Sequence, residues 1–135
     1  MIRNLLAVVI GFITGGLVNG ALINLGHSVV QLPPGADVST MEGVRDAMQH
    51  FGPEQYIFPF LAHAVGTLVA AFLAALIAAS SKFRIAMAMG VLFLVGGIVA
   101  GIWLRAPLWY DAVDFLFAYI PMAWIGAKLG GADRV

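Results

Sequence analysis

The chain has 135 residues, of which 61% are hydrophobic and only 10% are charged, and its formal net charge is zero. An average soluble domain carries roughly 25% charged residues, so the composition indicates one membrane-embedded domain over residues 1–135. The charge balance excludes a basic surface for nucleic acid. Because the chain has no cysteine, disulfides, thiolate metal sites and cysteine nucleophiles are excluded as well.

Hydropathy predicts four membrane-spanning helices, which makes the fold class an all-α polytopic membrane protein. Each apolar run is close to the ~20 residues that cross ~30 Å of hydrocarbon. The predicted spans are residues 5–30, 57–79, 83–104 and 109–128. The first is long enough to require a tilt or a protruding turn, and Pro121 in the last predicts a kink.

A cleaved signal peptide is the alternative for the first span. Arg3 precedes a short apolar core, and Val18-Asn19-Gly20 resembles a cleavage site. Against this reading, apolar character continues as far as Val30, beyond the length of a signal-peptide core. We therefore expect the segment to be a retained transmembrane helix.

The loop over residues 31–56 contains a helical pattern of its own. Ser39 and Glu42 fit a capping box, and apolar residues then recur at helical spacing until a glycine–proline pair ends the pattern. We expect a short amphipathic helix over residues 40–51 on the outer surface. It would act either as a lid over a cavity or as a plain connector that buries its apolar face.

Lysine and arginine residues gather on one predicted side of the membrane. Cationic loops resist translocation, so this side is expected to be the cytoplasm, and both termini are expected there. Five cations lie on that side and two on the other. The five are Arg3, Lys82, Arg84, Lys128 and Arg134, and the two are Arg45 and Arg105.

Small residues recur at four-residue spacing in three spans, which predicts close helix contacts, because close backbone approach replaces the hydrophobic force in lipid. Glycine-rich runs in the first and third spans also resemble each other. This indicates two helical hairpins in the same orientation, or else convergent packing. Some of these faces would alternatively contact another protomer in a homo-oligomer. The predicted packing residues are Gly11, Gly15, Gly16, Gly20, Gly66, Ala70, Ala74, Gly97 and Gly101.

Polar side chains from three spans are predicted at one depth below the outer boundary. At ~1.5 Å per residue, His63, Asp114 and Asn19 each lie roughly 7–9 Å inside. An ionisable group in hydrocarbon normally faces a partner or water, so we expect His63 and Asp114 to pair at the floor of an outward-facing polar pocket. A purely structural hydrogen bond is the alternative for His63. The other pocket residues predicted are Asn19, Asn24, His27 and Thr67 on the walls and Arg105 at the rim, paired with Asp111 or Asp114.

The sequence contains no nucleotide-binding, serine-hydrolase or zinc-peptidase motif. No catalytic residue and no cofactor is therefore assigned, and metal binding is left open. The leading expectation is a non-enzymatic membrane protein that binds or conducts a proton, a cation or a small solute through the pocket. The alternatives are an accessory subunit of a larger membrane complex, and a lipid- or quinone-binding protein or membrane-embedded enzyme.

A resemblance supports the architecture. The run FPFLAHAVGTL from Phe58 to Leu68 follows a loop that contains Pro33-Pro34-Gly35. In this combination most of the chain resembles small four-helix inner-membrane proteins of bacteria to which no activity is assigned. The resemblance implies a multi-pass protein of the bacterial inner (cytoplasmic) membrane, and it implies no activity and no site residue.

Overall fold

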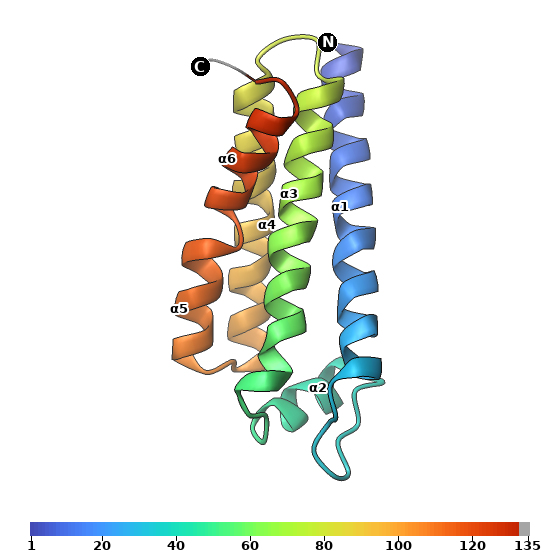
Figure 1. The fold of residues 1–135 in the computed structure, drawn as a ribbon, viewed down its shortest axis with the longest axis vertical. Helices are drawn as coiled ribbons and strands as arrows, with labels where there is room; N and C mark the ends of the chain where they lie inside the picture. Colours follow the sequence, from blue (N-terminus) through green and yellow to red (C-terminus); the bar gives the residue numbers. More distant parts are fainter. Residues whose placement is uncertain (133–135) are drawn as a thin grey trace.

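The computed structural model describes residues 1–132, which form helices joined by short loops, with no strand in that range (Figure 1). Four segments are long and apolar enough to cross a membrane, and they correspond to the four predicted spans. Arg134, one of the cations behind the predicted orientation, lies outside the described residues. The elements are α1 (Ile2–Val29), α2 (Met41–Met48), η1 (Pro53–Tyr56), α3 (Ile57–Ile77), α4 (Lys82–Leu104), α5 (Leu108–Phe117) and α6 (Ile120–Leu129).

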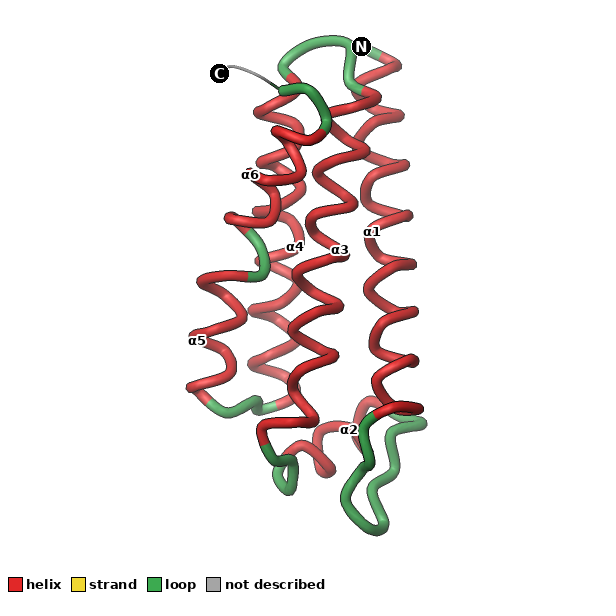
Figure 2. The backbone as a smooth tube through the Cα atoms, in the orientation of Figure 1, coloured by secondary structure: helices red, strands yellow, loops and turns green. Residues whose placement is uncertain are grey.

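The long helices run alternately along one axis, as the tube in Figure 2 shows. The start of α1 and the end of α6 lie at one end of the bundle, and α2 lies at the other. The central helix is α3, which packs against α1, α4 and α6, whereas α1 and α4 touch each other little. The sidedness of this bundle in a membrane and its origin as a repeated hairpin stay predictions.

The interface between α1 and α3 is built from backbone and small side chains. A methyl group added at Gly15 would lie 2.6 Å from both the Gly66 carbonyl oxygen and the Ala70 Cβ. One added at Gly11 would lie 2.6 Å from the Ala70 carbonyl oxygen and 3.4 Å from the Ala74 Cβ. Five of the predicted packing residues therefore lie at this interface, where the absence of side chains lets the two helices approach closely.

Gly16 and Gly20 do not take part in this packing, contrary to expectation. A Cβ at either position would have no other atom within 4 Å. One helical residue turns ~100° around the axis, so Gly16 faces away from the contact that Gly15 makes. The second four-residue glycine pair of α1 is therefore open, and the prediction that it packs within the chain is wrong.

Side chains at the start of α1 close the C-terminal end of α3. The Asn4 side-chain oxygen accepts hydrogen bonds from the backbone amides of Ala79 at 2.9 Å and Ser80 at 3.3 Å. The Arg3 Nε donates to the Ile77 carbonyl at 2.6 Å. The Arg3 bond satisfies a carbonyl that the end of α3 leaves free, and the Asn4 bonds satisfy amides of the loop that follows. Together they hold the start of α1 against the end of α3.

The fourth span is broken into α5 and α6 rather than continuous. Pro121 lies in the first turn of α6, where a missing amide proton costs little. If α5 continued through it, the proline ring would clash with the carbonyl of Phe117. The kink expected at Pro121 is therefore present in a stronger form, as a break at Ala118 and Tyr119.

The surface helix α2 is shorter than expected and begins differently. Its N-cap is Thr40, whose hydroxyl accepts from the Gly43 amide at 3.0 Å. Ser39 instead donates its hydroxyl to the Asp37 carboxylate at 2.6 Å. The capping box expected from Ser39 is wrong, because a nearby carboxylate competes for the serine side chain.

Candidate functional site

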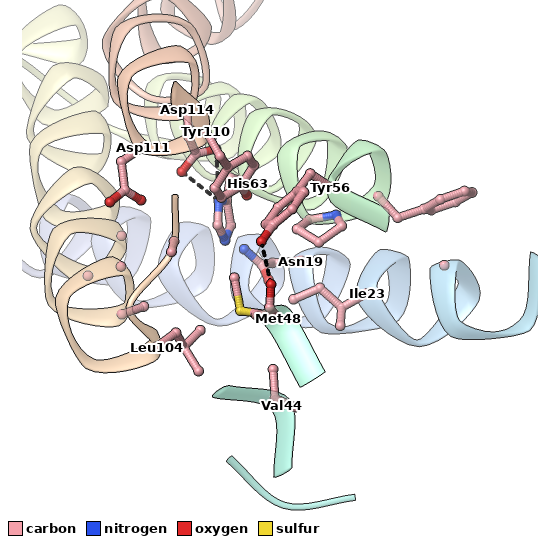
Figure 3. A pocket seen from close by; sticks show the side chains of 18 of the residues that line it. Asn19, Ile23, Val44, Met48, Tyr56, His63, Leu104, Tyr110, Asp111 and Asp114 are labelled. Carbon is pink, nitrogen blue, oxygen red and sulfur yellow. Dashed lines mark hydrogen bonds and ion pairs between the residues drawn. The ribbon is translucent and has the colours of Figure 1, made fainter. Parts of the chain in front are cut away.

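His63 of α3 and Asp114 of α5 lie against each other in the half of the bundle near α2 (Figure 3). The His63 Nδ1 is 2.8 Å from Asp114 Oδ2 and 2.9 Å from Oδ1. Asp114 is only 1% exposed, and His63 is partly exposed. The structure thus brings together the two ionisable side chains that depth along the helices placed at one level.

Tyr119, which sequence reasoning did not assign to the site, completes this cluster. Its hydroxyl donates to Asp114 Oδ2 at 2.8 Å, and its ring stacks on the His63 imidazole with centroids 5.7 Å apart. In a continuous helix Tyr119 would lie ~140° around the axis from Asp114. The break between α5 and α6 brings the Tyr119 side chain back to the same side as Asp114. The available sequence signal for this position was a tyrosine two residues before Pro121 in an apolar span.

Gly97 of α4 makes room for this tyrosine. A Cβ at Gly97 would collide with the Tyr119 hydroxyl and ring. Similarly, a Cβ at Gly101 would lie 2.8 Å from an oxygen of the Asp111 carboxylate. Both predicted packing residues of α4 therefore face polar side chains from the last span rather than a neighbouring backbone.

The hydrogen bonds determine which imidazole nitrogen faces outward. An ionised Asp114 has only acceptors, so we assign the shared proton of the pair to His63 Nδ1. In the neutral imidazole Nε2 is then an acceptor. Figure 3 shows this second nitrogen pointing away from Asp114 and toward Asn19, into an open space.

That space is a cavity of about 470 Å³ between α1, α3, α4 and α5, with α2 across one end. Its volume falls within the roughly 300–1,000 Å³ typical of small-molecule sites. The walls are mainly apolar, which corrects the expectation of a polar pocket. They include Phe12 and Ile23 from α1, Phe93 and Leu104 from α4, and Val44 and Met48 from α2.

A buried cluster holds α2 over the end of the cavity. Tyr56 is 3% exposed and donates its hydroxyl to the Met48 carbonyl at 3.1 Å. Met48, Tyr56 and Tyr110 pack together, and Gln49 donates a hydrogen bond to the Arg105 carbonyl at 3.4 Å. These contacts hold α2 across one end of the cavity and bury its apolar face, which is compatible with both roles expected for this helix.

The remaining predicted pocket residues divide into two groups. Asn19 and His27 of α1 line the cavity. Asn24 does not, because it lies ~140° around α1 from Asn19 and donates to a carbonyl of its own helix at 2.8 Å. Thr67 is fully buried behind the cavity wall, and its hydroxyl has no partner in residues 1–132. Arg105 is exposed.

The expected ion pair between Arg105 and Asp111 or Asp114 is absent from the described part of the chain. Arg105 ends α4 in a left-handed conformation with φ of 55°, and its side chain is directed to the surface. Asp111 lines the cavity without that partner. The prediction of a basic rim is therefore wrong.

Tyr110 is a second cavity residue that sequence reasoning missed. It is 5% exposed, yet its hydroxyl has no hydrogen-bond partner among residues 1–132. It lies on the cavity wall. A buried polar group without a partner carries a desolvation cost of about 1–3 kcal/mol, and this hydroxyl is enclosed by protein atoms, so only the rest of the Tyr110 side chain borders the cavity.

Metal binding, which the sequence left open, has no candidate centre within residues 1–132, where no three acidic or histidine side chains gather closely enough to hold an ion. The resemblance to small bacterial inner-membrane proteins stays a prediction. A scan of known protein families and searches of curated proteins and of solved structures found no match to this chain.

Proposed function

We propose that the chain is an integral membrane protein without catalytic activity that binds a small, mostly apolar molecule in the cavity between α1 and α4. The observation that carries this proposal is the cavity itself, with about 470 Å³ of space, apolar and aromatic walls, and a small group of polar side chains that includes Asn19, His63 and Asp111. Ligand sites have this character, since apolar walls supply affinity and a few polar groups fix orientation.

Binding is favoured over conduction through a single chain because the other half of the bundle is filled. There the helices meet at small side chains, which lets them approach closely. The cluster that fills this half consists of Ala70, Ala71, Ala74, Ala75, Ala86, Met89, Ala123, Ala127 and Ala132. No charged side chain belongs to this described cluster, so an ion entering beside His63 would meet an apolar barrier.

The route into the cavity is proposed to be lateral. α1 and α4 make few contacts with each other, and residues from both line the cavity. With both termini in the cytoplasm of a bacterium, as the cations predict, the cavity would open into the outer leaflet of the inner membrane. Gly20, which is open and does not line the cavity, remains available for the proposed oligomer or larger complex.

Substitutions that fill the cavity test the binding function. Gly16 and Gly96 line it, and a Cβ at either position would have no other atom within 4 Å, so Gly16→Leu and Gly96→Leu should occupy the space without disturbing a helix interface. Gly20→Leu is the matched control, because Gly20 is equally open but does not line the cavity.

The measurement is titration of the neutral fluorescent dye phenylnaphthylamine into the protein in lipid nanodiscs, against empty nanodiscs. We expect saturable binding to the wild type and to Gly20→Leu, and an affinity at least about tenfold lower, or about 1.4 kcal/mol, for the two filled variants. Equal dye affinities of the wild type and Gly16→Leu would overturn the proposal.

Transport is a second candidate, favoured by the interrupted span beside a His–Asp pair. Interrupted helices line the substrate and ion sites of many secondary transporters. His63→Ala should then abolish a solute flux that the wild type carries. A flux in proteoliposomes that is the same with and without His63 would remove this candidate.

A further inference from the structure

We infer that the cavity selects lipophilic cations, that is, organic molecules with a positive charge on an apolar body, over anions of the same shape. This inference rests on the proposed binding function and names the class of ligand. It follows from the charges on the cavity wall and from the aromatic rings beside them.

Two carboxylates face the cavity from one side of α5. Asp111 and Asp114 are three residues apart, which places them on the same face of a helix, and both line the cavity. Figure 3 shows both carboxylates on the side of the cavity where His63 lies. Asp114 is engaged by His63 and Tyr119, whereas Asp111 has no ion pair or side-chain hydrogen bond within the described chain.

The cavity wall carries no lysine or arginine among the described residues that line it. Its titratable cations are the two histidines, His63 and His27. His63 is already hydrogen-bonded to Asp114 at 2.8 Å, and His27 is an exposed residue of α1. The carboxylate of Asp111 is therefore left without a compensating charge inside the cavity, and apolar walls strengthen its attraction for a cation.

Aromatic rings lie beside this carboxylate. Tyr110 neighbours Asp111 in the chain and lines the cavity, while its own hydroxyl is enclosed by protein atoms. The rings of Tyr110 and Tyr119 line the same space, and aromatic faces attract cations.

The remaining walls decide what kind of cation fits. The described residues contain no cluster of three His, Asp or Glu side chains that would bind a metal ion. Most of the lining consists of Phe, Leu, Ile, Met, Val and Gly. These residues offer no oxygen ligands to replace the water molecules that surround an inorganic cation. An organic cation instead buries its apolar body against these residues while its charge lies near Asp111.

The test compares tetraphenylphosphonium with tetraphenylborate, two ions of the same shape and opposite charge. Each competes with bound phenylnaphthylamine in nanodiscs of zwitterionic lipid, and each apparent affinity is corrected for partition into empty nanodiscs. We expect the phosphonium to bind the wild type at least about tenfold more tightly than the borate. Asp111→Asn should weaken the phosphonium about tenfold and leave the borate unchanged or tighter.

Asp46→Asn is the control for surface charge, because Asp46 is an exposed carboxylate of α2 outside this cavity, and it should leave both affinities unchanged. Borate binding as tight as phosphonium binding, with dye binding intact, would overturn the inference and leave the proposed function standing. Absence of dye binding to the wild type would instead remove the proposed function. The comparison of the two ions in the wild type needs no variant. It therefore tests the inference even if Asp111→Asn does not fold.

Discussion

Gly15→Ala should destabilise the bundle even though alanine is the better helix former. The added methyl group would lie 2.6 Å from the Gly66 carbonyl oxygen and 2.6 Å from the Ala70 Cβ, whereas carbon atoms in contact are ~3.5–4.0 Å apart. The helices α1 and α3 must therefore separate by roughly 1 Å at this level. Such overpacking costs about 1–3 kcal/mol, and helix propensity offsets at most about 1 kcal/mol, so we expect a net loss of about 1–2 kcal/mol.

The control is Gly20→Ala in the same helix, where the methyl group meets no atom within 4 Å. Propensity alone then acts, so stability should stay the same or rise by up to about 1 kcal/mol. Reversible unfolding in mixed detergent micelles, followed by far-ultraviolet circular dichroism, gives both free energies of unfolding. If Gly15→Ala is as stable as Gly20→Ala, the close approach of α1 and α3 is refuted.

Four further substitutions test the cluster, the helix end and the loop. Tyr119→Phe removes one hydrogen bond to Asp114 and should cost about 0.6 kcal/mol in the same unfolding assay. Asp114→Ala should cost about 1–3 kcal/mol more, because it leaves buried donors unpaired, and the reverse order would contradict the geometry. Asn4→Ala removes the acceptor for two amides after α3, so their hydrogen exchange should accelerate by mass spectrometry, and unchanged exchange would count against this cap. Hydrogen bonds from the Ser39 hydroxyl and then its amide lower the pKa of Asp37. Since the folded pKa lies below the unfolded one, this contact stabilises the loop above the unfolded pKa and is lost as pH falls through the folded pKa; Ser39→Ala should raise the Asp37 pKa in a carboxyl NMR titration.

Depth along a helix could be predicted from the sequence, and the site contact that depended on depth alone is present. The length of an apolar run places each residue relative to a membrane boundary. His63 and Asp114 were counted from the same boundary on two spans, and their side chains meet at 2.8 Å. Four-residue spacing places Gly11 and Gly15 on one face of α1, and the structure shows this face in close contact with α3.

Direction around a helix could not be predicted in the same way. In α1 and α3 the apolar residues occur all around the helix, because lipid on one side and packed helix on the other both favour them. Asn24 and Thr67 were therefore assigned to the correct level but the wrong direction. Tyr119 was missed for a related reason, since its direction depends on a backbone break whose geometry no local pattern specifies.

Glycine has two different roles in the two halves of the bundle, and this difference bears on function. In the half filled by alanine, Gly11 and Gly15 permit contact, and a methyl group there would collide with α3. In the half near α2, Gly16 and Gly96 touch nothing, although each costs about 1 kcal/mol of helix propensity relative to alanine. The fold does not require these two glycines for packing within the chain. Their observable consequence is the open space beside His63, so a filled cavity should leave the bundle intact and abolish binding.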